Sequence, residues 1–193
     1  MDGFDNQHPL ELINEMIAVA KRSFVRMSYY FLLWGWLLLA AGLTEYAMRN
    51  LLDMAHLAWI GWPVVGVLGG VMAGLHGSRQ GKAAGVYTYM DRVYMYLWGA
   101  FVLTLVLYIV ASLFIRNNPG PGIIILTGLP TFVSGGVMRF RPLLVGGVLF
   151  WLLGLAAHLV PGEFSSLLFC AAIVVGYLVP GYLLKKAEVD GRV

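Results

Sequence analysis

The chain has 193 residues, of which 60% are hydrophobic and 12% are charged, and its formal net charge is +3. An average soluble domain is about 45–50% apolar and about 25% charged, so this composition excludes an ordinary water-soluble domain and, more firmly, a disordered chain. The single cysteine, Cys170, also excludes an internal disulfide and a multi-cysteine metal cluster. What remains is an integral membrane protein.

The N-terminal segment, residues 1–26, is expected to lie in the cytoplasm. From Pro9 to Arg26 its apolar residues recur at helical spacing, and its charged residues lie mostly off that stripe. This pattern predicts an amphipathic helix on the inner membrane surface that leads into the first span. A docking site for a cytoplasmic partner is the alternative interpretation.

Six apolar stretches follow, and each is close to the ~20 residues that a spanning helix needs. Because they are apolar all round rather than alternating, they predict helices and not the strands of a barrel. Pro142 suits the first turn of the fifth helix, where a missing N–H costs nothing. The predicted transmembrane domain, 27–184, contains the spans 27–48, 55–75, 93–115, 121–138, 142–160 and 164–184, and a tail of 185–193 follows it.

The basic residues predict how these spans are oriented. With the N-terminus inside, 11 of the 13 lysines and arginines fall on the cytoplasmic side and only Arg49 and Arg116 fall outside. Arg139 and Arg141 form an inner basic turn between the fourth and fifth spans. We therefore expect a bacterial inner-membrane protein with both termini cytoplasmic, whose basic residues face anionic lipid headgroups and not nucleic acid.

An internal repeat runs through the six spans. The first, third and fifth carry a tryptophan near a glycine, and the second, fourth and sixth carry a proline, namely Pro63, Pro130 and Pro180. This pattern predicts three helical hairpins of similar design. The prolines are expected to break their helices at similar depth, where they either open a central cavity or act only as packing kinks.

Small residues predict close helix packing in two of the spans. Gly66, Gly70 and Gly74 are spaced by four in the second span, and Gly135 and Gly136 lie in the fourth. Bare backbone along one helix face lets another helix approach closely. The partner helix belongs either to the same monomer or to another chain.

Ionisable residues within the spans gather near the outer boundary. Their absence from the middle of the membrane argues against a proton pump or a channel with a charged filter. His56 and His158, with Glu45 or Glu163, offer a hypothetical metal site, since two imidazoles and a carboxylate form a workable ligand set. Ordinary interfacial histidines are the alternative, and on that interpretation no cofactor is expected.

The sequence provides no convergent acid, base and nucleophile, so it names no catalytic residue. Ser134–Gly135 is similar to the serine–glycine step of intramembrane serine proteases (rhomboids). However, Phe132 occupies the position of the first glycine in that family's GxSG motif.

Three segments, FLLWGW (31–36), GLPTFVSGGVMRFRPLLVGGVLFW (128–151) and LVPGYLLKK (178–186), resemble a group of small bacterial six-helix membrane proteins with no assigned activity. The three-hairpin layout is also similar to that of the HdeD-type acid-resistance membrane proteins. Both resemblances imply an all-α membrane fold, and neither implies a chemistry.

These features favour a non-enzymatic structural or regulatory membrane protein that acts through helix packing and partner binding. The expected partners are membrane lipids and either a second copy of the chain or another membrane protein. A transporter or permease for a neutral, amphipathic or lipid-like solute is the alternative, because the three prolines offer a route to a cavity.

Overall fold

A computed structural model describes residues 27–52, 54–84 and 89–190, except for the side chains of 80–84, 89–91 and 163. Every regular element in these ranges is helical, which confirms the predicted all-α class. The amphipathic helix predicted between Pro9 and Arg26 lies outside the described residues.

Six helical rods in the described part of the chain are long and apolar enough to cross a membrane, as the six apolar stretches predict. The second rod begins with a 3₁₀ segment, and the last contains a π-helical segment. The elements are α2 (Met27–Asn50), η1 (Ala55–Ile60), α3 (Gly61–Ala84), α4 (Tyr89–Ile115), α5 (Gly120–Val137), α6 (Arg141–Leu159), α7 (Gly162–Ile173), η2 (Val174–Leu178) and α8 (Val179–Val189).

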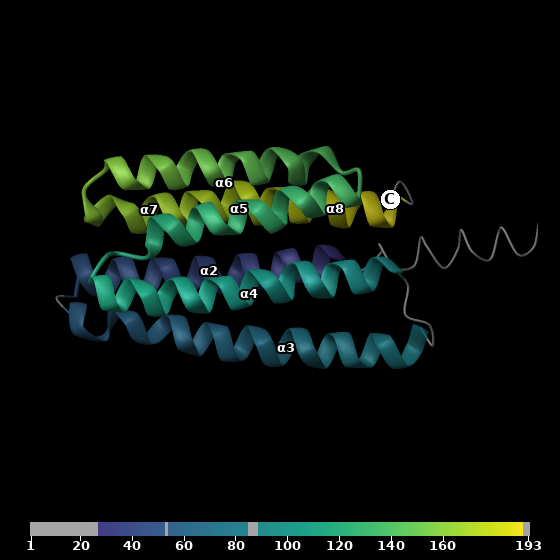
Figure 1. The fold of residues 1–193 in the computed structure, drawn as a ribbon, viewed down its shortest axis with the longest axis horizontal. Helices are drawn as coiled ribbons and strands as arrows, with labels where there is room; N and C mark the ends of the chain where they lie inside the picture. The colour runs from purple at the N-terminus through teal and green to yellow at the C-terminus, as the bar shows by residue number, and fades with distance from the viewer. Residues whose placement is uncertain (1–26, 53, 85–88, 191–193) are drawn as a thin grey trace, which may run out of the picture.

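The rods form two layers, with α5, α6 and the α7–η2–α8 rod in one and α2, α3 and α4 in the other (Figure 1). Consecutive rods run in opposite directions, so the start of α2 and the end of α8 lie at the same end of the bundle. The α7–η2–α8 rod packs against both α2 and α6, and α5 packs most extensively against α6. The core therefore lies between the last rod and α2, α5 and α6.

Glycine brings α5 and α6 into backbone contact. Gly128 and Gly135 on α5, like Gly147 and Gly154 on α6, are seven residues apart and share one helix face. A methyl group on Gly135 would lie 2.6 Å from the backbone nitrogen of Leu144. This closest pair joins helices from two different predicted hairpins, and the three-hairpin repeat stays a prediction.

A tight turn connects α5 to α6. Arg139 adopts a left-handed φ of 52°, and its N–H donates to the carbonyl of Gly136 at 3.1 Å. The N–H of Phe140 donates to the carbonyl of Gly135 at 2.8 Å, which completes a Schellman cap. Pro142 lies in the first turn of α6, as predicted. The cap satisfies carbonyls at the end of α5 that have no partner within the helix.

The last rod contains a wider, π-helical turn just before Pro180. Because proline has no N–H, the carbonyl of Gly176 loses its α-helical donor, and Val174–Leu178 forms a π-helix. A methyl group on Gly146 of α6 would lie 2.9 Å from that carbonyl oxygen. The widened turn therefore packs directly against a bare stretch of α6.

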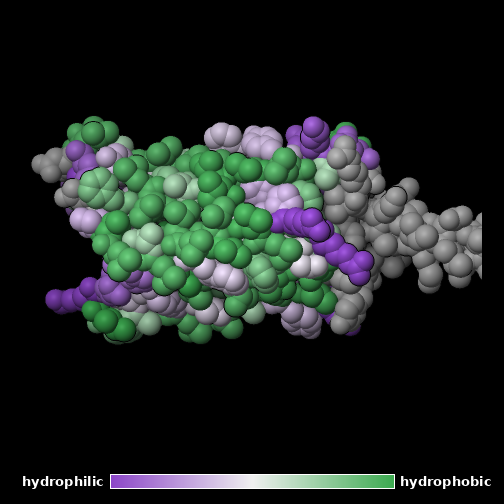
Figure 2. All heavy atoms as spheres, turned by 90° about the horizontal axis from the view of Figure 1, so that it is seen from above, coloured by the Kyte–Doolittle hydropathy of each residue, from purple (hydrophilic) through white to green (hydrophobic). Residues whose placement is uncertain are grey.

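The helices α3 and α4 lie at the periphery of the bundle, and most of their apolar side chains are exposed. Figure 2 shows hydrophobic residues across the middle of one face and hydrophilic residues toward both ends. Soluble monomers rarely expose so continuous an apolar surface. Together with the six long apolar rods, this surface indicates a multi-pass helical membrane protein.

Candidate functional site

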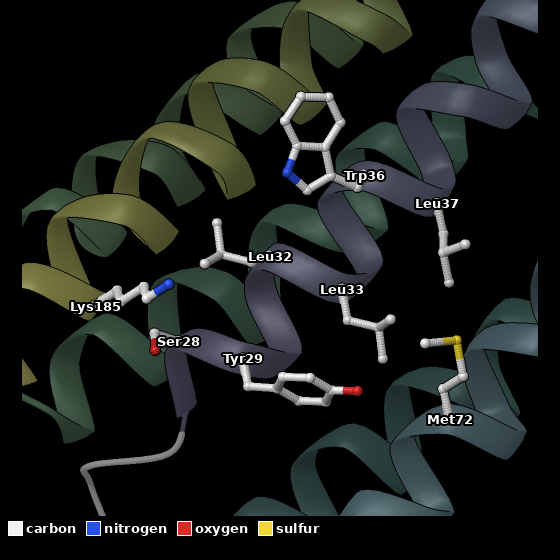
Figure 3. Close-up of a pocket in the computed structure, with 8 residues that line it drawn as sticks. All are labelled: Ser28, Tyr29, Leu32, Leu33, Trp36, Leu37, Met72 and Lys185. Atoms are coloured by element: carbon white, nitrogen blue, oxygen red, sulfur yellow. The ribbon is translucent and has the colours of Figure 1, made fainter.

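A groove with a volume of about 360 Å³ runs along the outward face of α2, between α3 and α8 (Figure 3). The residues that α2 contributes recur in pairs every four positions, so one helix face forms the floor of the groove. The lining residues are Ser28, Tyr29, Leu32, Leu33, Trp36 and Leu37 from α2, Met72 from α3 and Lys185 from α8.

The groove is polar at one end and apolar along the rest of its length. Ser28 and Lys185 lie together at the polar end, and Trp36 and Leu37 lie toward the apolar end (Figure 3). The indole N–H of Trp36 donates to the hydroxyl of Tyr182 at 3.2 Å, which holds the indole ring against α8. This division of polarity suits an amphiphilic molecule.

A hydrogen-bonded clamp closes the polar end of the groove. The backbone N–H of Ser28 donates to one carboxylate oxygen of Glu188 at 3.0 Å, and the hydroxyl of Ser28 donates to the other. The carboxylate thus binds an N–H in the first turn of α2, where the helix dipole favours negative charge. It also ties the first described span to the last.

The glycine stripe of α3 has no packing partner in the described part of the chain. Gly66, Gly70 and Gly74 are exposed, and a methyl group on any of them would meet nothing within 4 Å. Instead α3 packs on α2 through Gly69, where a methyl group would lie 2.8 Å from the ring of Trp34. The residues predicted to mediate packing therefore face away from the bundle.

The two predicted packing glycines of α5 differ from one another. Gly135 is buried against α6, whereas a methyl group on Gly136 would have its nearest neighbour, a side-chain carbon of Leu144, at 4.0 Å. Only Gly135 therefore makes the close helix approach that the sequence predicts.

The three prolines occupy different places in their helices. Pro130 lies inside α5 and is fully buried, and Pro180 is fully buried at the start of α8. Pro63 is exposed in the first turn of α3, after the 3₁₀ segment of the same rod, so it lies within the second span but nearer its start than its middle. None of the three lines the groove, and a cavity between them stays a prediction.

The carboxylate of Glu45 is already engaged within the bundle. One oxygen accepts from the Nε of Arg49 at 2.9 Å, and the other accepts from the indole N–H of Trp62 at 2.9 Å. Glu45 thus links the end of α2 to the start of α3 and has both carboxylate oxygens occupied.

The predicted outer histidines are both exposed, His56 on η1 and His158 near the end of α6. Among the described residues, no group of three histidine, cysteine or carboxylate side chains is placed to hold a metal ion. The structure therefore does not group His56, His158 and Glu45 as metal ligands. The set with Glu163 stays a prediction, because that side chain lies outside the described part.

The two arginines of the inner basic turn lie together in the structure. Arg139 and Arg141 are exposed on the turn between α5 and α6, which lies at the same end of the bundle as the end of α8 (Figure 1). The turn therefore carries two positive charges at the end where the chain's described termini lie.

Buried hydroxyl groups form a feature that the sequence analysis missed. The hydroxyl of Tyr94 donates to the carbonyl of Ser134 at 3.2 Å, and the hydroxyl of Thr131 donates to the carbonyl of Thr127 at 2.8 Å. Thr131 and Ser134 are fully buried, and within the described residues the hydroxyl of Ser134 has no hydrogen-bond partner. Their spacing of three on α5 was the available signal, since it places both hydroxyls on one helix face.

Among the described residues, no histidine hydrogen-bonds to the hydroxyl of Ser134. Because α5 and α6 are antiparallel, Ser134 lies beside the start of α6, whereas His158 lies near the other end of that helix. His158 follows Leu144 by 14 positions, which correspond to about 21 Å of helix. The likeness to the serine–glycine step of rhomboids is therefore confined to the sequence.

Comparisons with known proteins identify no relative of this chain. No family model matches it, and neither does a curated protein or a solved structure. Its function must therefore be inferred from its own residues.

Proposed function

We propose that the six rods cross a bacterial inner membrane as three hairpins, with both termini in the cytoplasm. The distribution of basic residues supports this orientation, because all but two of the 13 fall at the ends assigned to the cytoplasm. The even number of rods supports it as well, since the start of α2 and the end of α8 lie at one end of the bundle (Figure 1).

Within that membrane the protein acts as a structural or regulatory component that binds a partner helix on α3. One observation carries this proposal: Gly66, Gly70 and Gly74 form an open strip of backbone that nothing in the described chain covers. Small residues at this spacing are a common means by which spanning helices associate. A second copy of this chain is the simplest partner to test.

A permease for a lipid-like solute is the second candidate, and the groove on α2 favours it. Leu37 follows Ser28 by nine positions, so the groove follows about 14 Å of helix, which is about half of a hydrocarbon core of about 30 Å. The groove therefore offers an amphiphile a site on one side of the bilayer. It offers no path to the other side, so partner binding has the stronger support.

Cysteine crosslinking in native membranes tests the partner proposal. In a Cys170→Ala background, Val67→Cys places a thiol beside the glycine stripe, on a side chain that is 66% exposed. We expect crosslinked species above the monomer mass. Adding Gly70→Ile should reduce their yield at least about fivefold, the factor that about 1 kcal/mol of helix association represents.

Gly99→Ile is the matched control, because a methyl group on Gly99 also meets nothing within 4 Å, and this glycine lies on α4, away from the stripe. It should leave the crosslinking yield unchanged. Neither isoleucine is expected to clash within the monomer, so a lower yield reports association and not misfolding. Capture of the monomer alone would contradict the proposal.

A further inference from the structure

We infer that the groove on α2 binds one molecule of an anionic phospholipid, taken from the leaflet that faces the chain's termini. Its negatively charged headgroup lies at Lys185, and an acyl chain follows the apolar floor toward Trp36 and Leu37 (Figure 3). This inference rests on the six-span arrangement proposed above and is independent of the partner proposed for α3.

The length of the groove matches a single leaflet. About 14 Å of α2 separates Ser28 from Leu37, and half of a hydrocarbon core is about 15 Å. Its volume of about 360 Å³ lies within the usual range of ligand pockets, about 300–1,000 Å³. A lipid seated here would extend from the interface to the middle of the bilayer.

The lining beyond the polar end is suited to an acyl chain. Leu32, Leu33, Leu37 and Met72 present aliphatic or thioether carbons, and methionine adapts its shape to an irregular neighbour. A second protein helix is a poorer fit to this narrow groove, because α3 and α8 flank its floor on both sides.

Charge selects an anionic headgroup. Lys185 is the only charged residue among those that line the groove, and in the described part of the chain it forms no ion pair. The neighbouring carboxylate of Glu188 accepts hydrogen bonds from Ser28 through both of its oxygens, and it forms no salt bridge with Lys185. The lysine head therefore remains available to a phosphate group, while its stem lies along apolar surface.

Native mass spectrometry of the full chain released from nanodiscs tests this inference. The nanodiscs contain equal amounts of dioleoyl phosphatidylglycerol and dioleoyl phosphatidylcholine. We expect the released protein to retain one lipid, predominantly phosphatidylglycerol. Lys185→Gln should lower the ratio of retained phosphatidylglycerol to phosphatidylcholine about fivefold, since one lysine near the surface contributes about 1 kcal/mol to anionic lipid binding.

Lys186→Gln is the matched control, because it removes the same charge one position along α8, from an exposed residue that does not line the groove. It should leave the lipid ratio close to that of the unsubstituted protein, because Lys186 does not line the groove that holds the retained lipid. A further variant, Leu33→Trp, fills the floor and should abolish lipid retention.

Equal retention of the two lipids would overturn the inference, and so would an equal effect of Lys186→Gln and Lys185→Gln. It would also be overturned if the unsubstituted protein retained a second protein chain in place of lipid and Leu33→Trp did not. Failure of the protein to enter nanodiscs would be a different result. It would contradict the six-span arrangement itself, and the lipid site with it.

Discussion

At the scale of single residues, the effect of a glycine depends on what faces it across the bundle. Gly135 faces the backbone of α6, and its neighbour Gly136 faces only a distant side chain of Leu144. The sequence predicts both as packing residues. It cannot separate them, because a helix that is apolar all round carries no polar face to indicate which side is buried.

Gly135→Ala is expected to lower the free energy of unfolding by about 1–3 kcal/mol, the usual cost of overpacking a tight interface. The added methyl group would lie 2.6 Å from the backbone nitrogen of Leu144, so α5 and α6 must move apart. Thermal unfolding in detergent measures the change.

Gly136→Ala provides the control, because both alanines raise helix propensity equally and only the first creates a clash. Equal midpoints for the two variants would show that α5 and α6 do not pack as closely as described.

At the scale of elements, the number and position of the helices follow from local properties of the chain. Length and continuous hydropathy predict the six rods, and Pro142 marks the start of α6 correctly. Contacts between distant segments were not predictable in this way. Ser28 and Glu188 are 160 residues apart, and the groove forms only because α3, α2 and α8 come together.

The clamp between Ser28 and Glu188 is expected to stabilise the docking of α2 on α8. Glu188→Gln should lower the free energy of unfolding by about 1–2 kcal/mol, because it removes a charged acceptor from the start of α2. A double-mutant cycle with Ser28→Ala in detergent should give a coupling energy of at least about 0.5 kcal/mol.

Ser112→Ala is the control for this cycle, because the hydroxyl of Ser112 donates only to the carbonyl of Tyr108 in its own helix. It should show no coupling to Glu188→Gln. If Ser28→Ala also showed no coupling, the ends of α2 and α8 would not be joined as described.

At the scale of the whole molecule, an even number of antiparallel rods places both described ends of the chain on one side. The same side carries the turn with Arg139 and Arg141, and it carries Lys185 at the mouth of the groove. The cytoplasmic assignment and the lipid site both depend on this arrangement. The number of crossings is therefore the central claim.

A topology map with paired reporters tests that claim most directly. Green fluorescent protein, which fluoresces in the cytoplasm, and alkaline phosphatase, which is active only outside it, are each fused at the N-terminus, after Arg116 and at the C-terminus. Six crossings with the basic ends in the cytoplasm predict fluorescence at both termini and phosphatase activity after Arg116. Phosphatase activity at one terminus and fluorescence at the other would contradict the account.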